Sequence, residues 1–383
     1  MNWLKRPLIG LSVATAAALV LSGCAGGGAG AGSDDAQEIS RVGVAMPTQT
    51  SERWIADGDA VKSGLEEAGY TVDLQFANDD IPTQTQQIDQ MITNGADILV
   101  IAAIDGTALS AQLQSAADQG IKVISYDRLL LNTENVDFYV SFDNYQVGVA
   151  IGTSLLNGLG LVDEEGAALD DAPSGPFNIE LFGGSPDDNN AVLLYNGAMD
   201  TIQPYIDNGT IVVKSGQTDF DTIATLRWSQ ETAQKRMEDL ITSTYGGGSE
   251  QLDAVLSPFD GISRGIITAL QNAGYGDTIA DGLPVVTGQD AEVASVSLIN
   301  TGVQFSTIFK DTRTLAAQAV TVVKDYAAGN EPEPNDTETY DNGVKVVPSY
   351  LLPVITIVQD NIESELIDSG YYTQEEVDAG VTS

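Results

Sequence analysis

The sequence predicts an α/β protein with two similar lobes, each built on a mainly parallel sheet flanked by helices. Strand-like and helical segments alternate from Arg41 onward, which is typical of βαβ units. One strand, residues 98–102, is apolar throughout, as expected for a sheet that helices cover on both faces. The alternation stops at an acidic stretch with Gly and Pro, residues 162–176, and then starts again, so we expect a second lobe of the same kind.

The first run of the pattern is regular. Its predicted strands are residues 42–45, 71–76, 98–102, 123–126 and 138–142, and its predicted helices are residues 54–68, 81–94 and 109–119. Gly69, Gly95 and Gly120 follow these helices directly, and glycine is the residue that most often ends a helix in the left-handed conformation. In the first helix Val61 and Leu65 fall on one side, as an amphipathic helix requires.

The second run is followed by a tail that continues to form strands. We expect a helix at 146–159 before the acidic stretch, and after it helices at 190–208, 225–244, 261–273 and 291–300 and strands at 177–182, 211–214, 254–256, 285–287 and 304–309. A long helix at 312–328 and late strands at 344–347 and 354–358 follow. Late strands must return to sheets that began much earlier, so the chain is expected to cross between the lobes more than once. Several crossings make a hinge, and a hinge between two lobes makes a cleft.

The predicted boundaries follow from this pattern. The first lobe comprises residues 39–142 plus about 311–348, and the second lobe comprises 143–310 plus about 349–383. Residues 1–23 have the order of a secretion signal, with Lys5 and Arg6 before an apolar segment. The run LSGC ending at Cys24 resembles a bacterial lipobox, which implies a lipidated cysteine followed by a flexible tether, residues 24–38. We therefore expect an extracytoplasmic protein that is lipid-anchored to the cell membrane.

The composition excludes several classes of function. The 383 residues include 16 basic and 55 acidic side chains, a net charge of −39, and such a surface repels nucleic acid and anionic lipid. The absence of histidine and the single cysteine exclude Ser-His-Asp and Cys-His catalysis and zinc sites built on these residues. We expect no cofactor and no metal, while chemistry based on carboxylates stays open.

Polar residues recur where the predicted strands end, which is where open α/β sheets bind ligands. They are Asp105, Asp127, Arg128, the run 187–190, Asp260, Asp290 and Lys310. Taken singly, Asp105, Asp188 and Asn189 are better explained as helix caps, and a lone Asp-Arg pair as a surface salt bridge. The number of such positions together favours a polar pocket for a ligand rich in hydroxyl groups.

Two tryptophans support this interpretation. Trp54 follows Arg53, and Trp228 follows Arg227, each near the start of a predicted helix and one in each lobe. An indole face suits the C–H face of a pyranose, while polar groups bind its hydroxyls. The alternative is that both rings are packing residues of the core or its edge.

Nine short runs resemble those of the periplasmic monosaccharide receptors of ABC importers, which are type I periplasmic binding proteins, and in particular the xylose-binding and ChvE-type multiple-sugar receptors. The runs are RW at 53–54, IDG at 104–106, YDR at 126–128, FDN at 142–144, FGGSPDDNN at 182–190, TLRW at 225–228, SPFDG at 257–261, GQDA at 288–291 and STIFKDT at 306–312. The resemblance extends from Arg41 to about Tyr372. It implies two lobes that are joined by a hinge with three chain crossings. The lobes would close over a pyranose.

The resemblance also implies the ligand-binding residues. Trp54 and Trp228 would enclose the sugar ring, and the hydroxyls would be bound by Arg53, Asp127, Arg128, Asn190, Asp260, Asp290 and Lys310, with Asp105 and Asn189 as further candidates. The lipobox departs from the nearest receptors, which are freely periplasmic, and implies a tether to the cell membrane.

We therefore expect a monomeric, non-enzymatic lipoprotein that binds an aldopyranose such as xylose, glucose, galactose or arabinose and delivers it to the membrane permease of an ABC importer. One alternative is a receptor that reports the sugar to a membrane kinase. Another is a tethered glycosidase that uses Asp260 and Asp290 as its carboxylate pair. A DNA-binding repressor is disfavoured because an export signal, and not a basic headpiece, precedes Arg41.

Overall fold

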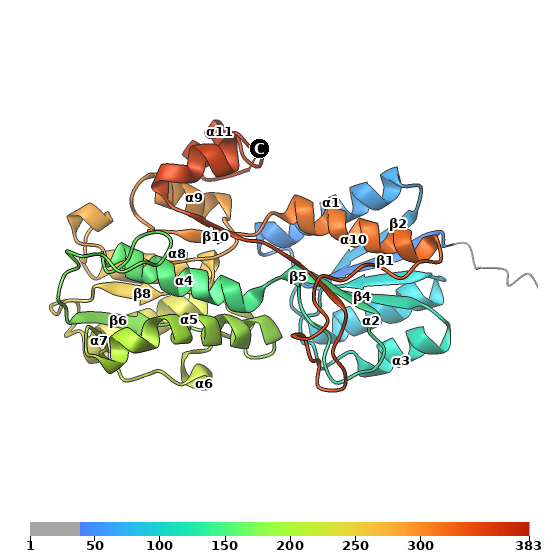
Figure 1. Ribbon diagram of the computed structural model, residues 1–383, viewed down its shortest axis with the longest axis horizontal. Coiled ribbons are helices and arrows are strands. Elements are labelled where there is room, and N and C mark those ends of the chain that lie inside the picture. The colour runs from blue at the N-terminus through green and yellow to red at the C-terminus, as the bar shows by residue number, and fades with distance from the viewer. Residues whose placement is uncertain (1–38, 383) are drawn as a thin grey trace, which may run out of the picture. The chain divides into compact units, whose positions relative to one another are not determined.

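The computed structural model describes residues 39–382, which form two lobes of α/β structure (Figure 1). The predicted signal, Cys24 and the tether lie outside the described residues. Among residues 39–382, no helix is both long enough and apolar enough to cross a membrane.

The first lobe is built on a six-stranded parallel sheet in the order β11-β5-β4-β3-β1-β2. Its strands are β1 (Arg41–Met46), β2 (Thr71–Phe76), β3 (Ile98–Ile101), β4 (Lys122–Tyr126), β5 (Phe138–Phe142) and β11 (Ser349–Leu352). Helices α1 (Glu52–Glu67) and α10 (Thr312–Ala327) pack on one face, and α2 (Ile81–Thr93) and α3 (Ser110–Asp118) on the other (Figure 1). All four residues of β3 are buried, which agrees with the expected sheet covered on both faces.

The second lobe contains a four-stranded parallel sheet in the order β7-β6-β8-β9. The strands are β6 (Phe177–Leu181), β7 (Ile211–Val213), β8 (Ala254–Leu256) and β9 (Val285–Val286), and a separate antiparallel pair joins β10 (Thr307–Phe309) to β12 (Ile355–Ile357). Helix α4 (Asn144–Gly158) packs against α5 (Asn189–Asp207), α7 (Gln230–Thr244) against α8 (Asp260–Asn272), and α9 (Val293–Asn300) against α11 (Gln374–Ala379). The predicted fold class, α/β with two parallel-sheet lobes, is confirmed.

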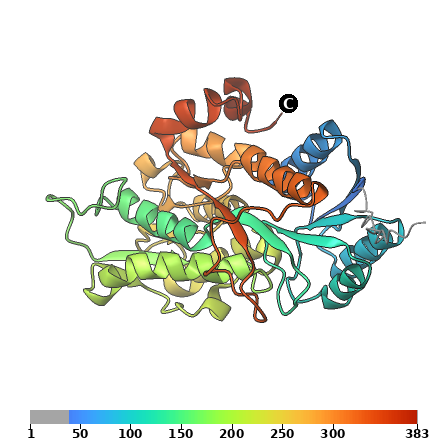
Figure 2. The same cartoon turned by 45° about the vertical axis from the view of Figure 1, so that its right-hand side comes forward.

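The chain crosses between the lobes three times, and the third crossing differs from the prediction (Figure 2). The first crossing leads from β5 to α4 and the second from β10 to α10. Strand β11 pairs in parallel with β5, so it belongs to the first lobe and not to the second. The third crossing therefore lies between Leu352 and Ile355, after the boundary near residue 348 that the sequence pattern indicates.

Two predicted elements take a different form. The helix predicted at 225–244 begins only at Gln230, because Arg227 and Trp228 have positive φ angles of 59° and 55° and Ser229 caps α7 by accepting from the Thr232 N–H. No strand is present at 344–347. That segment belongs to a loop in which the Asn342 side chain donates to two backbone carbonyls of the 130–133 turn.

Candidate functional site

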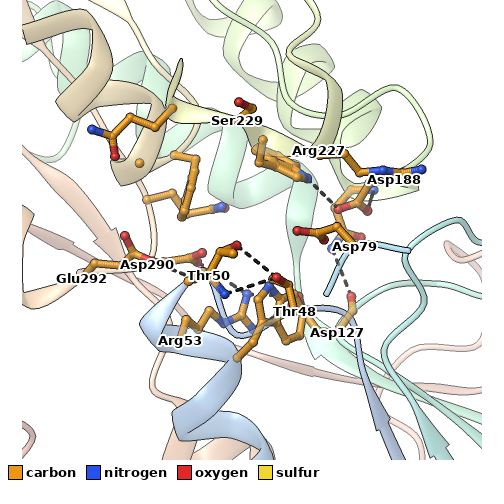
Figure 3. A pocket seen from close by; sticks show the side chains of 18 of the residues that line it. Thr48, Thr50, Arg53, Asp79, Asp127, Asp188, Arg227, Ser229, Asp290 and Glu292 are labelled. Carbon is orange, nitrogen blue, oxygen red and sulfur yellow. Dashed lines mark hydrogen bonds and ion pairs between the residues drawn. The ribbon is translucent and has the colours of Figure 1, made fainter. Parts of the chain in front are cut away.

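A cavity of about 440 Å³ lies between the lobes and is lined by residues of both. We call one side the first-lobe wall: Thr48, Thr50, Ser51, Arg53, Trp54, Asp79, Asp127 and Arg128. The facing second-lobe wall includes Asp188, Asn190, Arg227, Trp228, Phe259, Arg264, Gln289, Asp290, Glu292 and Lys310. Many of these residues follow the carboxyl ends of parallel strands, the usual ligand position in open α/β sheets. Figure 3 shows Arg227 and Asp188 across the cavity from Arg53.

Eight of the eleven residues expected to bind the ligand line this cavity: Arg53, Trp54, Asp127, Arg128, Asn190, Trp228, Asp290 and Lys310. Asp105 does not, because its carboxylate accepts from the N–H and hydroxyl of Thr107 at 2.8 and 2.7 Å in an exposed turn. Asn189 does not either; it is the first residue of α5, directly after the N-cap Asp188, and the next residue, Asn190, reaches the cavity instead.

Asp260 is the third residue that the structure places elsewhere. It is fully buried behind the second-lobe wall, where it accepts from the Glu292 N–H at 2.9 Å, Gln304 Nε2 at 2.9 Å and the Thr307 hydroxyl at 3.0 Å. Burial raises the pKa of Asp260 to about 8. Because Asp260 does not line the cavity, it cannot flank a ligand together with Asp290, and the carboxylate pair of a glycosidase is not formed.

Arg53 is the centre of the first-lobe wall. Its side chain is 4% exposed and donates to both oxygens of Asp127, with distances of 3.2 Å from Nη1 and 2.7 Å from Nη2. Its Nε lies 3.0 Å from Asp57, and its Nη1 lies 3.5 Å from Asp290 of the second lobe. A guanidinium in this bidentate arrangement is fixed in orientation, so Arg53 presents a rigid set of donors.

The carboxylates around Arg53 are in different electrostatic states. Burial alone would raise the pKa of Asp127, but the charges of Arg53 and Lys310 outweigh it and hold that pKa well below its usual range. Asp57 is buried, does not line the cavity, and accepts from the Tyr126 hydroxyl at 2.5 Å. There burial dominates and raises the pKa of Asp57 to about 7.

Asp188 connects the lobes at one end of the cavity. Its Oδ2 lies 3.0 Å from Arg128 Nε of the first lobe and accepts from Trp228 Nε1 at 3.2 Å. Its Oδ1 accepts from the Asn190 N–H, so the cap expected from the sequence is present as well. The Asn190 amide then donates to the Asp127 carbonyl at 3.1 Å, which adds a second bond between the lobes.

Glu292 connects the lobes at the other end. It is 3% exposed, and its two oxygens accept from Ser51 Oγ of the first lobe and from Arg264 Nη2 of the second, both at 2.6 Å. Ser51 occupies the N-cap position of α1, yet its side chain makes no hydrogen bond to the start of that helix. Nearby, Lys310 Nζ lies 3.0 Å from the Asp290 carboxylate.

The two indoles are held in different ways. Trp54 lies in the first turn of α1, is 5% exposed, and has the guanidinium groups of Arg53 and Arg128 at 4.8 and 5.0 Å from its ring centroid. Trp228 is half-buried and lies against Gly184, where a Cβ atom would come within 2.1 Å of the indole Cη2. Residue 184 must therefore be glycine for the ring to occupy this position.

Backbone strain is concentrated at this cavity. Among the described residues, eight residues other than glycine have positive φ, and five of them line the cavity: Asp79, Asp127, Arg227, Trp228 and Asp290. Two others, Asn78 and Ala291, are their direct neighbours in sequence. Such strain costs about 1–3 kcal/mol per residue and persists mainly where it positions functional groups. This is evidence for a site that does not depend on any likeness to other proteins.

Several lining residues escape prediction from the sequence. Thr48, Thr50 and Ser51 follow β1, Asp79 follows β2, and Gln289 and Glu292 flank Asp290. The strand-end rule would have found the residues after β1 and β2 had it been applied to hydroxyl groups and to every strand. Nothing in the sequence indicates that the Asp188 side chain both caps a helix and contacts the other lobe.

Comparisons with known proteins agree with this geometry. A model of the periplasmic binding protein domain matches residues 42–331. The chain is 53% identical to the multiple sugar-binding periplasmic receptor ChvE of Rhizobium radiobacter over 342 residues, which are 89% of this chain and 93% of that protein. It is 35% identical to the D-xylose-binding periplasmic protein of Escherichia coli, again over 89% of this chain and 93% of that protein.

Solved structures lead to the same conclusion. The fold is similar to that of an ABC transporter solute-binding protein from Clostridium phytofermentans with bound β-D-glucose, with a TM-score of 0.82 and 45% identity over 88% of this chain and all of that one. A solute-binding protein from Chloroflexus aurantiacus in complex with D-glucose gives a TM-score of 0.77 at 32% identity, over 88% of this chain and 98% of that one. From these matches, the chain belongs to the periplasmic binding protein family and is a binding protein and not an enzyme.

Proposed function

We propose that this protein is the extracytoplasmic, lipid-anchored substrate-binding protein of an ABC sugar importer, and that it binds an aldopyranose such as xylose, glucose, galactose or arabinose. The lobes close over the sugar, and the closed form is the one that the membrane permease receives. The protein acts as a monomer.

The observation that carries this proposal is the concentration of rare cations in one cavity. Five of the 16 basic residues of this acidic chain line it, and four of them lie beside a carboxylate of the same cavity. Paired charges of this kind are fixed in orientation and nearly neutral as a set, so they favour a neutral ligand with many donors and acceptors over an ion. A monosaccharide has this chemistry, and sugars are named as ligands of several relatives.

The two tryptophans support a pyranose in particular. Trp54 lines the first-lobe wall and Trp228 the second-lobe wall, so a ring between the lobes can meet an aromatic face from each. Closure is supported by the bonds between the lobes, such as those of Arg128 with Asp188 and of Ser51 with Glu292. Contacts of this kind exist only when the two walls are close, which couples ligand binding to lobe position.

The test of ligand binding is calorimetry on the full chain with D-xylose, D-glucose, D-galactose and L-arabinose. We expect saturable heat with at least one aldose and a matching change in tryptophan fluorescence. A folded protein that gives neither signal with any of them would exclude the proposal.

The lipid anchor is tested separately by fractionating cells that produce the chain. We expect the protein in the membrane fraction, and we expect Cys24→Ser to release it or to leave its precursor unprocessed. A wild-type protein found only in the soluble fraction would contradict the anchor while leaving sugar binding untouched.

A further inference from the structure

One side chain of the second-lobe wall has no hydrogen-bond partner. Gln289 lines the cavity and is 3% exposed, and neither end of its amide is bonded to any other described residue; its Oε1 is buried without a donor. Leaving a buried polar group unpaired costs about 1–3 kcal/mol, so nearly all such groups are bonded in native proteins. An exception in the wall of a binding cavity requires an explanation.

The other buried glutamines of the described chain show how unusual this is. Gln84 is 1% exposed and satisfied at both ends, since Nε2 donates to the Ala102 carbonyl and Oε1 accepts from the Ile104 N–H, both at 2.9 Å. Gln304 is also 1% exposed; its Nε2 donates to Asp260 and to the Ser306 carbonyl, whereas its Oε1, like that of Gln289, has no donor. Gln289 alone among these three makes no side-chain hydrogen bond.

The backbone around Gln289 is fixed, so the side chain cannot move far to find a partner. Its carbonyl accepts from the Asp260 N–H at 3.1 Å, the Asp290 N–H donates to Ile308 at 2.8 Å, and the Ile308 N–H donates to Gly288 at 3.1 Å. Gly288 is tightly enclosed as well, because a Cβ there would lie 2.2 Å from Asp260 Oδ1.

The neighbouring charges are already in use. Asp290 is paired with Lys310 and Arg53, and Glu292 with Ser51 and Arg264. The amide of Gln289 is thus the neutral, unengaged donor and acceptor in this part of the wall. A hydroxyl group, which also donates and accepts, is the ligand group that matches an amide of this kind.

We propose that Gln289 binds one hydroxyl group of the sugar and thereby determines specificity at that position. This inference rests on the proposed function, because it assumes a polyhydroxylated ligand in the cavity. A site that bonds a particular hydroxyl through a buried group discriminates strongly against the analogue that lacks it, since the protein group then stays unpaired.

The experiment combines a protein variant with altered ligands. Affinities are measured by calorimetry for wild type and Gln289→Met, using whichever of D-glucose, D-galactose, D-xylose and L-arabinose binds wild type most tightly, together with its set of monodeoxy analogues. Methionine keeps the length of the side chain but cannot form the hydrogen bond. We expect Gln289→Met to bind the parent sugar about tenfold more weakly than wild type does. For one deoxy analogue, the variant should bind the analogue and the parent sugar equally well. It should still bind every other deoxy analogue more weakly than the parent sugar, as wild type does.

Gln84→Met serves as the matched control. It removes a satisfied buried amide that does not line the cavity, so it should lower the melting temperature and leave the affinity of the folded protein unchanged. Unchanged parent affinity in Gln289→Met, or an equal loss of affinity for every analogue, would overturn the inference. If wild type itself binds no aldose, the proposed function fails and not the role of Gln289 alone.

Discussion

In the first-lobe wall, Arg53 is held by side chains, because it lies among the carboxylates of Asp57 and Asp127 and reaches Asp290 across the cavity. In the second-lobe wall, Trp228 and Asp290 are held by the backbone, with φ angles of 55° and 91°. Arg53 is thus held by charge pairing and Trp228 by local conformation, although each wall contains both features, since Asp127 has a φ of 59° and Asp290 pairs with Lys310. The difference implies that loss of the charge at Arg53 does the most damage in the first wall, whereas added volume beside Trp228 does the most damage in the second.

The largest effect is expected from Arg53→Met. The variant leaves three carboxylates around one buried position without their common cation, and removing one partner of a buried pair costs about 3–5 kcal/mol. We expect a loss of this size in the free energy of unfolding, measured with urea, and loss of sugar binding in calorimetry.

Lys62→Met is the control on the same helix. Lys62 pairs with Glu66 at the exposed surface, where an ion pair contributes less than about 1 kcal/mol. If the two variants lost equal stability, the network around Arg53 would not organise the first-lobe wall.

A smaller effect is expected from Gly184→Ala in the second lobe. The added methyl group would overlap the Trp228 ring and displace it, and overpacking of this kind costs about 1–3 kcal/mol. We expect sugar affinity to fall about tenfold or more, with an altered tryptophan emission spectrum.

Gly183→Ala tests whether the position of the ring is the cause. The three atoms nearest to a Cβ at Gly183 would belong to Ile223, Phe220 and Ala224, at 3.2, 3.3 and 3.4 Å, and none of them belongs to Trp228. Affinity that fell equally in both variants would show that the strand end, and not the indole, had been disturbed.

The effect of pH is the smallest when it is expressed per pH unit, and it has opposite signs for Asp260 of the second lobe and Asp127 of the first. The unfolded chain loses the Asp260 proton near its ordinary pKa of 3.8, whereas the folded protein keeps it until about pH 8. Folding therefore takes up a proton in this range, and the stability of wild type should fall relative to Asp260→Asn by at most about 1.4 kcal/mol per pH unit, and level off above pH 8.

Asp127 has the opposite sign, because its depressed pKa contributes stability at neutral pH that is lost in acid. Thermal melts of wild type and Asp260→Asn between pH 5 and 9 measure the difference. A constant gap between the two curves across this range would contradict the buried, protonated state of Asp260.

The sequence predicted the parts of this molecule that depend on local pattern. The alternation of strands and helices was sufficient for the two lobes, and the strand-end rule found Asp127, Arg128 and Asp290. The same pattern wrongly placed Trp228 inside a helix. Nothing near Trp228 in the sequence indicates that Gly184, which is distant in sequence, leaves room for the indole ring outside the helix.

The contacts between the lobes could not be predicted for the same reason. Ser51 and Glu292 are separated by 241 positions, and each has an adequate local role as a cap or as a surface acid. Asp260 illustrates the reverse error, since it stands at a strand end with the right chemistry but faces Gln304 and Thr307 in the interior. Packing decides whether a side chain at a strand end points into the cavity or into the interior. A single sequence does not reveal that packing.

The hydroxyl of Ser51 links the geometry of the cleft to the start of a helix. It donates to Glu292 of the opposite lobe, and the first turn of α1, which carries Arg53 and Trp54, goes without the cap that a serine in this position normally supplies. A movement that carried Glu292 away would return this hydroxyl to its own helix. The amide protons of that turn would then exchange with solvent at different rates in the two arrangements, so they offer an intrinsic reporter of lobe position that needs no attached probe.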